Sequence, residues 1–147
     1  MTDRLRICSM LALGLLLIPA PVAAQRTEGP SQAGVICPKT AAAFARLELL
    51  FGTTKSAGGA VTEAEWQAFL DEEVTKRFPD GLTVLTGYGQ FRASSGNIVK
   101  EAAKMLIIWY KPDGDSEARI EAVRQAYKSR FAQESVLRAD GASCISF

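Results

Sequence analysis

The chain has 147 residues, of which 17 are basic, 16 are acidic and none is histidine. Without histidine it cannot form serine–histidine or cysteine–histidine nucleophile pairs, histidine general bases or the common zinc sites. The balanced charge argues against a general nucleic-acid binder, which needs a basic surplus to displace counterions. We therefore expect no nucleic-acid partner, no metal and no cofactor.

Residues 1–24 have the features of a cleavable secretory signal peptide. The start carries two arginines, and the apolar run 7–18 that follows is too short to span a bilayer. Val22-Ala23-Ala24 supplies the small residues that signal peptidase accepts, so we expect cleavage before Gln25. An uncleaved membrane anchor is the alternative. Cleavage predicts a periplasmic or secreted protein with no stable membrane insertion.

Cleavage at this position leaves 123 residues, with 15 basic and 15 acidic side chains. Residues 25–42 begin with a polar stretch and are interpreted as a flexible segment, and residues 43–147 as a single domain. The two remaining cysteines, Cys37 and Cys144, lie near opposite ends of this chain. Because disulfides persist in exported proteins, we expect the two to be bridged. Two separate thiols are the alternative.

The first half of the domain contains one predicted strand and one predicted helix. Residues 43–51 are rich in apolar side chains and are followed by Gly52, which favours a strand. Thr62-Glu63-Ala64-Glu65 matches a capping box, which marks a helix start. Apolar residues recur at helical spacing from Trp66 to Phe78, and the helix is expected to end at the following Pro-Asp-Gly.

The second half begins with a predicted hairpin. Strands are expected over 82–92 and 104–111, with a turn at Ser94-Ser95-Gly96-Asn97. A second helix follows the turn at 112–116, with a buried face formed by Ile120, Val123, Tyr127 and Phe131. A short strand is expected over 134–138, and residues 139–147 are interpreted as a tail held by its cysteine.

This order is β-α-β-β-α-β, the split βαβ arrangement of the ferredoxin-like α+β fold. In that topology the first and third strands are central in a four-stranded antiparallel sheet. These are also the two most apolar strands of the chain. Both helices are expected to cover one face of the sheet, which leaves the other face bare, covered by a partner, or covered by the tail.

Two groups of polar residues are candidates for a binding patch on the helix-free face. Arg46 and Glu48 alternate with apolar residues on the first strand, where buried charges are costly unless paired or hydrated. Tyr88, Gln90 and Arg92 recur at period two, and neighbouring glycines let a ligand approach. A structural cross-strand ion pair or an open solvated face is the alternative for the first group. A twisted edge strand with glycine bulges is the alternative for the second.

Two longer stretches carry a family resemblance. Residues 63–92 read EAEWQAFLDEEVTKRFPDGLTVLTGYGQFR, and near the end the chain reads QESVLR over 133–138 and CISF over 144–147. The chain from Phe44 to Phe147 resembles an uncharacterised family of exported bacterial proteins, domain of unknown function 3574. The resemblance supplies no activity and assigns no role to any residue.

Two functional hypotheses remain. The first is an exported binding or interaction module whose helix-free face meets a small molecule, an envelope protein or a second copy in a homodimer. The alternative is an isomerase- or lyase-like enzyme in which Glu48 acts as a carboxylate base with Tyr88 or Arg92, because such a base needs no histidine. A deep pocket with Glu48 at its floor would favour the enzyme, and a flat or covered face the module.

Overall fold

The computed structural model describes residues 35–147. The predicted signal peptide and most of the predicted flexible segment lie outside the described residues. Within 35–147, no helix is long and apolar enough to cross a membrane.

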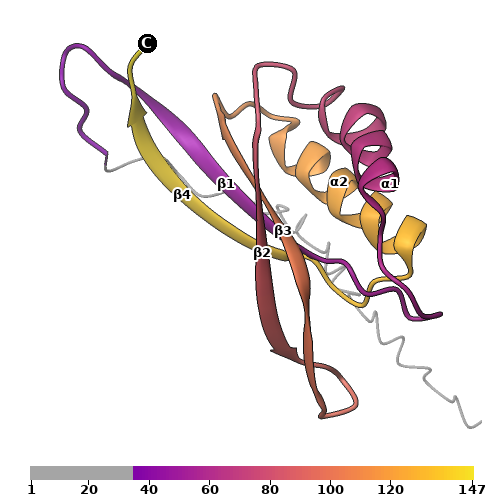
Figure 1. Cartoon of the computed structure of the whole chain (residues 1–147). Coiled ribbons are helices and arrows are strands. Elements are labelled where there is room, and N and C mark those ends of the chain that lie inside the picture. The colour runs from indigo at the N-terminus through magenta and orange to yellow at the C-terminus, as the bar shows by residue number, and fades with distance from the viewer. Residues whose placement is uncertain (1–34) are drawn as a thin grey trace, which may run out of the picture.

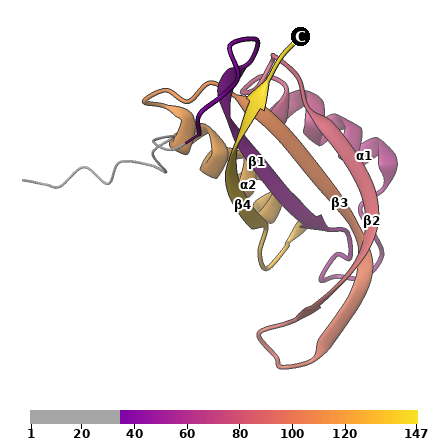
Figure 2. The same cartoon turned by 90° about the vertical axis from the view of Figure 1, so that its left-hand side faces the viewer.

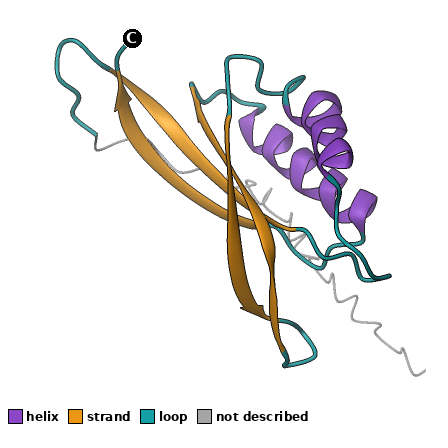
Figure 3. Ribbon diagram, in the orientation of Figure 1, coloured by secondary structure: helices purple, strands orange, loops and turns teal. Residues whose placement is uncertain are grey.

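The described chain folds into one sheet with a layer of helices on one side (Figures 1 and 3). The elements follow the order β-α-β-β-α-β. Their bounds are β1 Ala42–Gly52, α1 Glu63–Phe69 with a π-helical turn over Leu70–Val74, β2 Thr83–Arg92, β3 Ile98–Tyr110, α2 Ser116–Phe131 and β4 Leu137–Ile145.

The sheet has the strand order β2-β3-β1-β4, and every neighbouring pair is antiparallel. The predicted ferredoxin-like fold is confirmed, with β1 and β3 at the centre. Both helices lie over the same face of the sheet (Figure 1). The opposite face is therefore free of helices along its whole length.

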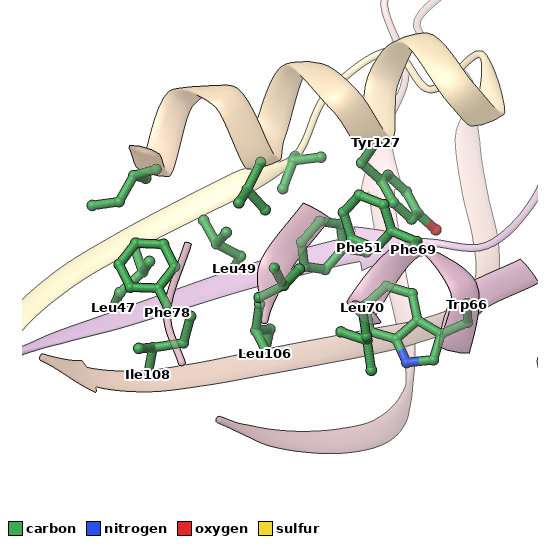
Figure 4. Packing of buried hydrophobic residues seen from close by; sticks show 14 of the residues in the cluster. Leu47, Leu49, Phe51, Trp66, Phe69, Leu70, Phe78, Leu106, Ile108 and Tyr127 are labelled. Atoms are coloured by element: carbon green, nitrogen blue, oxygen red, sulfur yellow. The ribbon is translucent and has the colours of Figure 1, made fainter. Parts of the chain in front are cut away.

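The core lies between the sheet and the helices. Alternation on β1 buries Leu47, Leu49 and Phe51, and their register partners on β3 include the buried Leu106 and Ile108. Aromatic rings from both helices fill the centre, where Phe51 meets Tyr127 edge-to-face at 4.6 Å between ring centroids (Figure 4).

The capping box at the start of α1 is present as predicted. The Thr62 hydroxyl accepts the Glu65 amide at 3.2 Å, and the Glu65 carboxylate accepts the Thr62 amide at 2.8 Å. The predicted helix does not continue as an α-helix to Pro79, because it widens into the π turn at Leu70. Buried side chains in this segment recur every four residues, whereas an α-helix has 3.6 residues per turn. A regular α-helix would therefore turn successive buried side chains away from the core, and the wider π turn offsets this rotation.

Two strands are longer than the sequence patterns predicted. β3 begins at Ile98 and not at Lys104, so it pairs with β2 along the whole hairpin. β4 spans Leu137–Ile145, so most of the predicted tail is a strand paired with β1. The far end of the β2–β3 hairpin projects beyond the helix layer and curves toward the turn between α2 and β4 (Figure 2).

The predicted disulfide between Cys37 and Cys144 is present, with 5.4 Å between the two Cα atoms. Cys144 lies opposite Ala43 in the β1–β4 pairing. The bridge therefore fastens the segment before β1 to the end of β4, across a sequence separation of 107 residues.

Candidate functional site: the helix-free sheet face

The register arranges side chains of the helix-free face in rows across the strands, because directly paired residues of an antiparallel sheet point to the same side. One row mixes polar and apolar residues and contains Thr83, Ile107, Glu48 and Ala139. The next row is apolar and contains Leu85, Met105, Leu50 and Leu137. The row after it contains only small residues, Gly87, Ala103 and Gly52.

The structure separates the five predicted patch residues into two groups. Arg46 and Glu48 lie on the helix-free face as expected, paired in register with Trp109 and Ile107 of β3. Tyr88, Gln90 and Arg92 lie on the opposite face of the hairpin, paired with Ala102, Lys100 and Ile98. The expected single patch of five residues does not form, because β2 presents its odd-numbered residues to the helix-free face.

Arg46 and Glu48 form an ion pair with each other along β1. The Arg46 side chain is 43% exposed and that of Glu48 is 23% exposed, so both charges keep access to water. The Arg46 Nε is buried without a hydrogen-bond partner among the described residues. The pair is structural but joins two residues of the same strand, and not residues of neighbouring strands as the alternative interpretation of the sequence had it. Glu48 also lies outside the cleft described next.

The row of small residues leaves a hollow in the helix-free face. Because Gly89 has no side chain and Ala103 has only a methyl group, space stays open between the apolar row and Phe91, whereas the space over Gly52 is taken by the Glu101 side chain. The result is a cleft of about 210 Å³. Its lining residues are Leu50, Phe51, Gly52, Gly89, Gln90, Phe91, Glu101, Ala103, Gln133, Glu134, Ser135 and Leu137.

Glu101 is the one strongly buried charged residue lining this cleft, with 7% of its surface exposed. Its Oε2 accepts the Thr54 amide at 2.6 Å. The carboxylate lies directly over Gly52, where any added Cβ would overlap it. A side chain at residue 52 would therefore displace the Glu101 carboxylate from this position.

The turn after α2 forms the opposite wall of the cleft, and hydrogen bonds hold it in place. The Tyr127 hydroxyl donates to the Gly52 carbonyl at 2.8 Å, and Gln133 Nε2 donates to the Thr54 carbonyl at 2.6 Å. The tip of the hairpin joins the same wall, because the Ser94 amide donates to Glu134 Oε1 at 3.1 Å.

Burial raises the pKa of the Tyr127 hydroxyl, and the nearby Glu101 and Glu65 carboxylates raise it further. Tyr127 therefore stays a neutral donor to the Gly52 carbonyl. This bond fixes the end of β1, where the cleft begins.

The sequence patterns did not single out Glu101 or Gly52. A signal was nevertheless available, because Gly87 and Gly89 are two residues apart on β2 and empty one face of that strand. Placing Glu101 beside them required the start of β3, which the apolar run from Lys104 did not reveal.

These features define a small ferredoxin-like α+β domain with an open sheet face that is hollowed at one end. The chain belongs to the family described as "Protein of unknown function (DUF3574)", whose model matches residues 46–147. The match confirms the resemblance noted in the sequence. No curated protein matches the chain.

Solved structures are similar to this chain at low sequence identity. A phage SAM lyase in complex with S-methyl-5'-thioadenosine is 15% identical, with 71% of this chain and 90% of that chain covered and a TM-score of 0.57. CutA from Synechococcus elongatus is 18% identical, with 70% and 82% covered and a TM-score of 0.45. The phage enzyme is similar in fold alone.

Proposed function

We propose that this protein is an exported binding module that holds a small organic molecule in the cleft of its helix-free sheet face. The observation that carries the proposal is the hollow itself. The small residues Gly89 and Ala103 leave the face open between an apolar row and Phe91. Ligand sites are concave and mostly apolar, with few polar groups, and this cleft has that composition.

The size of the cleft limits its occupant. A volume of about 210 Å³ lies below the roughly 300–1,000 Å³ of pockets for drug-sized ligands. The walls are also held by hydrogen bonds from α2 and from the hairpin tip, so the cleft is formed before a ligand binds. Both features favour a small, compact ligand over a peptide or a nucleotide.

The enzyme hypothesis built on Glu48 has no support in this geometry. Tyr88 and Arg92, its expected partners, lie on the other face, and Glu48 instead pairs with Arg46. Glu48 also does not line the cleft.

The proposal is tested by a substitution that fills the cleft with a side chain. Gly89 has an ordinary backbone conformation, and a Cβ there would meet only Ala103, at 3.9 Å, so Gly89→Leu is expected to fold and to occupy the cleft. The control is Ala102→Leu, which adds a large side chain to the exposed opposite face of the hairpin. The probes are 2-phenylethylammonium, 2-phenylethanol and 3-phenylpropionate, followed by amide NMR shifts.

At least one probe should shift amides in 50–52, 89–91 and 101–103. Gly89→Leu should weaken that probe about tenfold or more, a difference of about 1.4 kcal/mol, whereas Ala102→Leu should leave it unchanged. The proposal is wrong if no probe shifts these amides, or if Gly89→Leu binds as well as the unaltered protein.

Export is the second part of the proposal. The disulfide fits an oxidising compartment, because thiols are kept reduced in the cytosol. The arginine-led apolar start and Val22-Ala23-Ala24 support cleavage before Gln25. N-terminal sequencing of the secreted product should begin at Gln25, and a full-length product retained in membranes would contradict export.

A further inference from the structure

All charged side chains that line the cleft are negative. Two of its lining residues are acidic, Glu101 and Glu134, and no lysine or arginine is found among the described residues that line it. Neither carboxylate forms an ion pair within residues 35–147. The ion pairs found among the described residues involve other carboxylates, so the negative charge of the cleft is not compensated by a neighbouring lysine or arginine.

Glu101 is largely buried, and only one of its two carboxylate oxygens has a hydrogen-bond donor among the described residues. More than nine-tenths of its surface is covered, and its described hydrogen bond, from the Thr54 amide, goes to Oε2. A carboxylate accepts several hydrogen bonds and is costly to bury without compensation. The second oxygen, Oε1, lies over Gly52, which is itself part of the cleft lining, and has no hydrogen-bond donor among the described residues.

The remaining walls determine what kind of cation can fit. Leu50, Phe91, Leu137 and Ala103 present apolar surface, which suits a carbon substituent. A hard metal ion such as calcium needs six or more oxygen ligands, and no group of three or more candidate metal ligands occurs in residues 35–147. The ligand chemistry is therefore that of an organic ion with one charged end.

We propose that the cleft selects a small organic cation, a primary ammonium group on a short apolar body, with the ammonium donating to Glu101 Oε1. This inference rests on the proposed function. The apolar body would lie against Leu50 and Phe91. Glu134 at the rim adds a second negative charge, and charge-assisted N–H···O⁻ bonds are about twice as strong as neutral ones.

The experiment compares the three probes introduced above, since 2-phenylethylammonium, 2-phenylethanol and 3-phenylpropionate share an apolar body and differ in charge. The protein is the disulfide-bonded product secreted from cells expressing the full chain, titrated by amide NMR at neutral pH. The ammonium probe should bind about tenfold more tightly than either other probe. Its preference should also decrease as salt is added, because salt screens the attraction.

Glu101→Gln is the decisive variant. Glutamine can still accept the Thr54 amide through its carbonyl oxygen, so the structural bond is kept while the charge is lost. The preference for the ammonium probe should then largely disappear. Glu48→Gln is the matched control, because it removes a carboxylate from the same face outside the cleft and should leave the preference intact.

The outcomes separate this inference from the proposed function. If all three probes bind equally and Gly89→Leu excludes them, the cleft binds ligands and only the cation selectivity is wrong. Tighter binding of 2-phenylethanol or 3-phenylpropionate, a preference retained in Glu101→Gln, or a preference insensitive to salt would also overturn the inference. If no probe binds, the proposed function and the inference both fail.

Discussion

The carboxylate of Glu65 accepts hydrogen bonds from two different partners at the start of α1. It accepts the Thr62 amide in the capping box, and it accepts Lys55 Nζ at 2.7 Å from the preceding loop. Hydrogen bonding from Lys55, and then from the Thr62 amide and hydroxyl, lowers the pKa of Glu65 from 4.5 to about 2. The ionised form is therefore favoured in the folded protein.

This shift predicts a pH-dependent contribution to stability. Because the folded-state pKa is lower than the unfolded one, the contribution is fully present above pH 4.5 and is lost as pH falls toward about 2. Glu65→Gln should lower the melting temperature at neutral pH. The difference from the unaltered protein should shrink steadily across that acid range when thermal melts are recorded at successive pH values.

Asp71→Asn is the control for this series. Asp71 is exposed, and the structure shows no hydrogen bond or ion pair to its side chain among the described residues. Its effect on the melting temperature should be small at every pH. A Glu65→Gln difference that stays constant from neutral pH to pH 2 would show that the Lys55 and Thr62 contacts do not act through the charge of Glu65.

Thr62 and Glu65 could be read from the sequence because their interaction is local, with donor and acceptor three positions apart. Glu101 could not, because its partner amide at Thr54 lies 47 residues away. Nothing within the segment around Glu101 distinguishes it from an exposed glutamate. Its burial depends on Gly52, on another strand, having no side chain.

At the scale of elements, the sequence predicts strands where apolar residues dominate. The predicted strands are too short where the real strand continues through polar or small residues. Residues 98–103 contain lysine, glutamate and two alanines, and β4 contains aspartate, glycine and serine. These residue types are depleted in strands, yet pairing with β2 and β1 overrides that preference. Strand length in such segments is set by the partner strand and not by local composition.

The position of the disulfide at the end of β4 indicates that it stabilises the folded domain. Cys144 pairs in register with Ala43, and its bridge to Cys37 closes a loop with a sequence separation of 107 residues. By the loop-entropy argument, replacing both cysteines with serine should lower the free energy of unfolding by about 4–5 kcal/mol. Denaturant unfolding of the double variant and the oxidised protein measures this difference.

Amide hydrogen exchange measures how the loss of the disulfide affects the stability of individual strands. Without the bridge, amides of β4 near Cys144 should lose protection, whereas the β1–β3 amides at the centre of the sheet should lose it only through global unfolding. A double variant within about 1 kcal/mol of the oxidised protein, with unchanged β4 protection, would mean that strand pairing alone holds this end.

At the scale of the whole molecule, the sheet register decides which side chains share a face. A shift of one residue exchanges the two faces of a strand, and the β2 pattern has apolar residues of both parities, including Val84 and Leu85. The sequence therefore predicted the sheet and its order but assigned Tyr88, Gln90 and Arg92 to the wrong face. The face that β2 does contribute, Leu85, Gly87, Gly89 and Phe91, is the one that forms the apolar row and the cleft.

The apolar side chains on this face predict self-association. Leu85 is 51% exposed and Trp109 37%, and neither residue lines the cleft. Large exposed apolar patches are uncommon on monomers. Four strands about 4.8 Å apart, with about nine residues each, give a flat area of roughly 500–600 Å², below the ~800 Å² per partner of a standard interface and in the range of weak dimers. Arg46 and Glu48 neutralise each other, so two copies would meet without like-charge repulsion.

We therefore expect a dimer in analytical ultracentrifugation and its conversion to a monomer by Trp109→Glu, because the new carboxylate would be buried without a partner. Ile98→Glu is the matched control: Ile98 is also an exposed apolar residue of β3, but it lies on the opposite face, so this variant should stay dimeric. Trp109 lies beside Arg46, away from Glu101, so the monomeric variant should still bind the ammonium probe in the cleft. A monomeric unaltered protein, or equal dissociation by both variants, would show that a second copy does not cover this face.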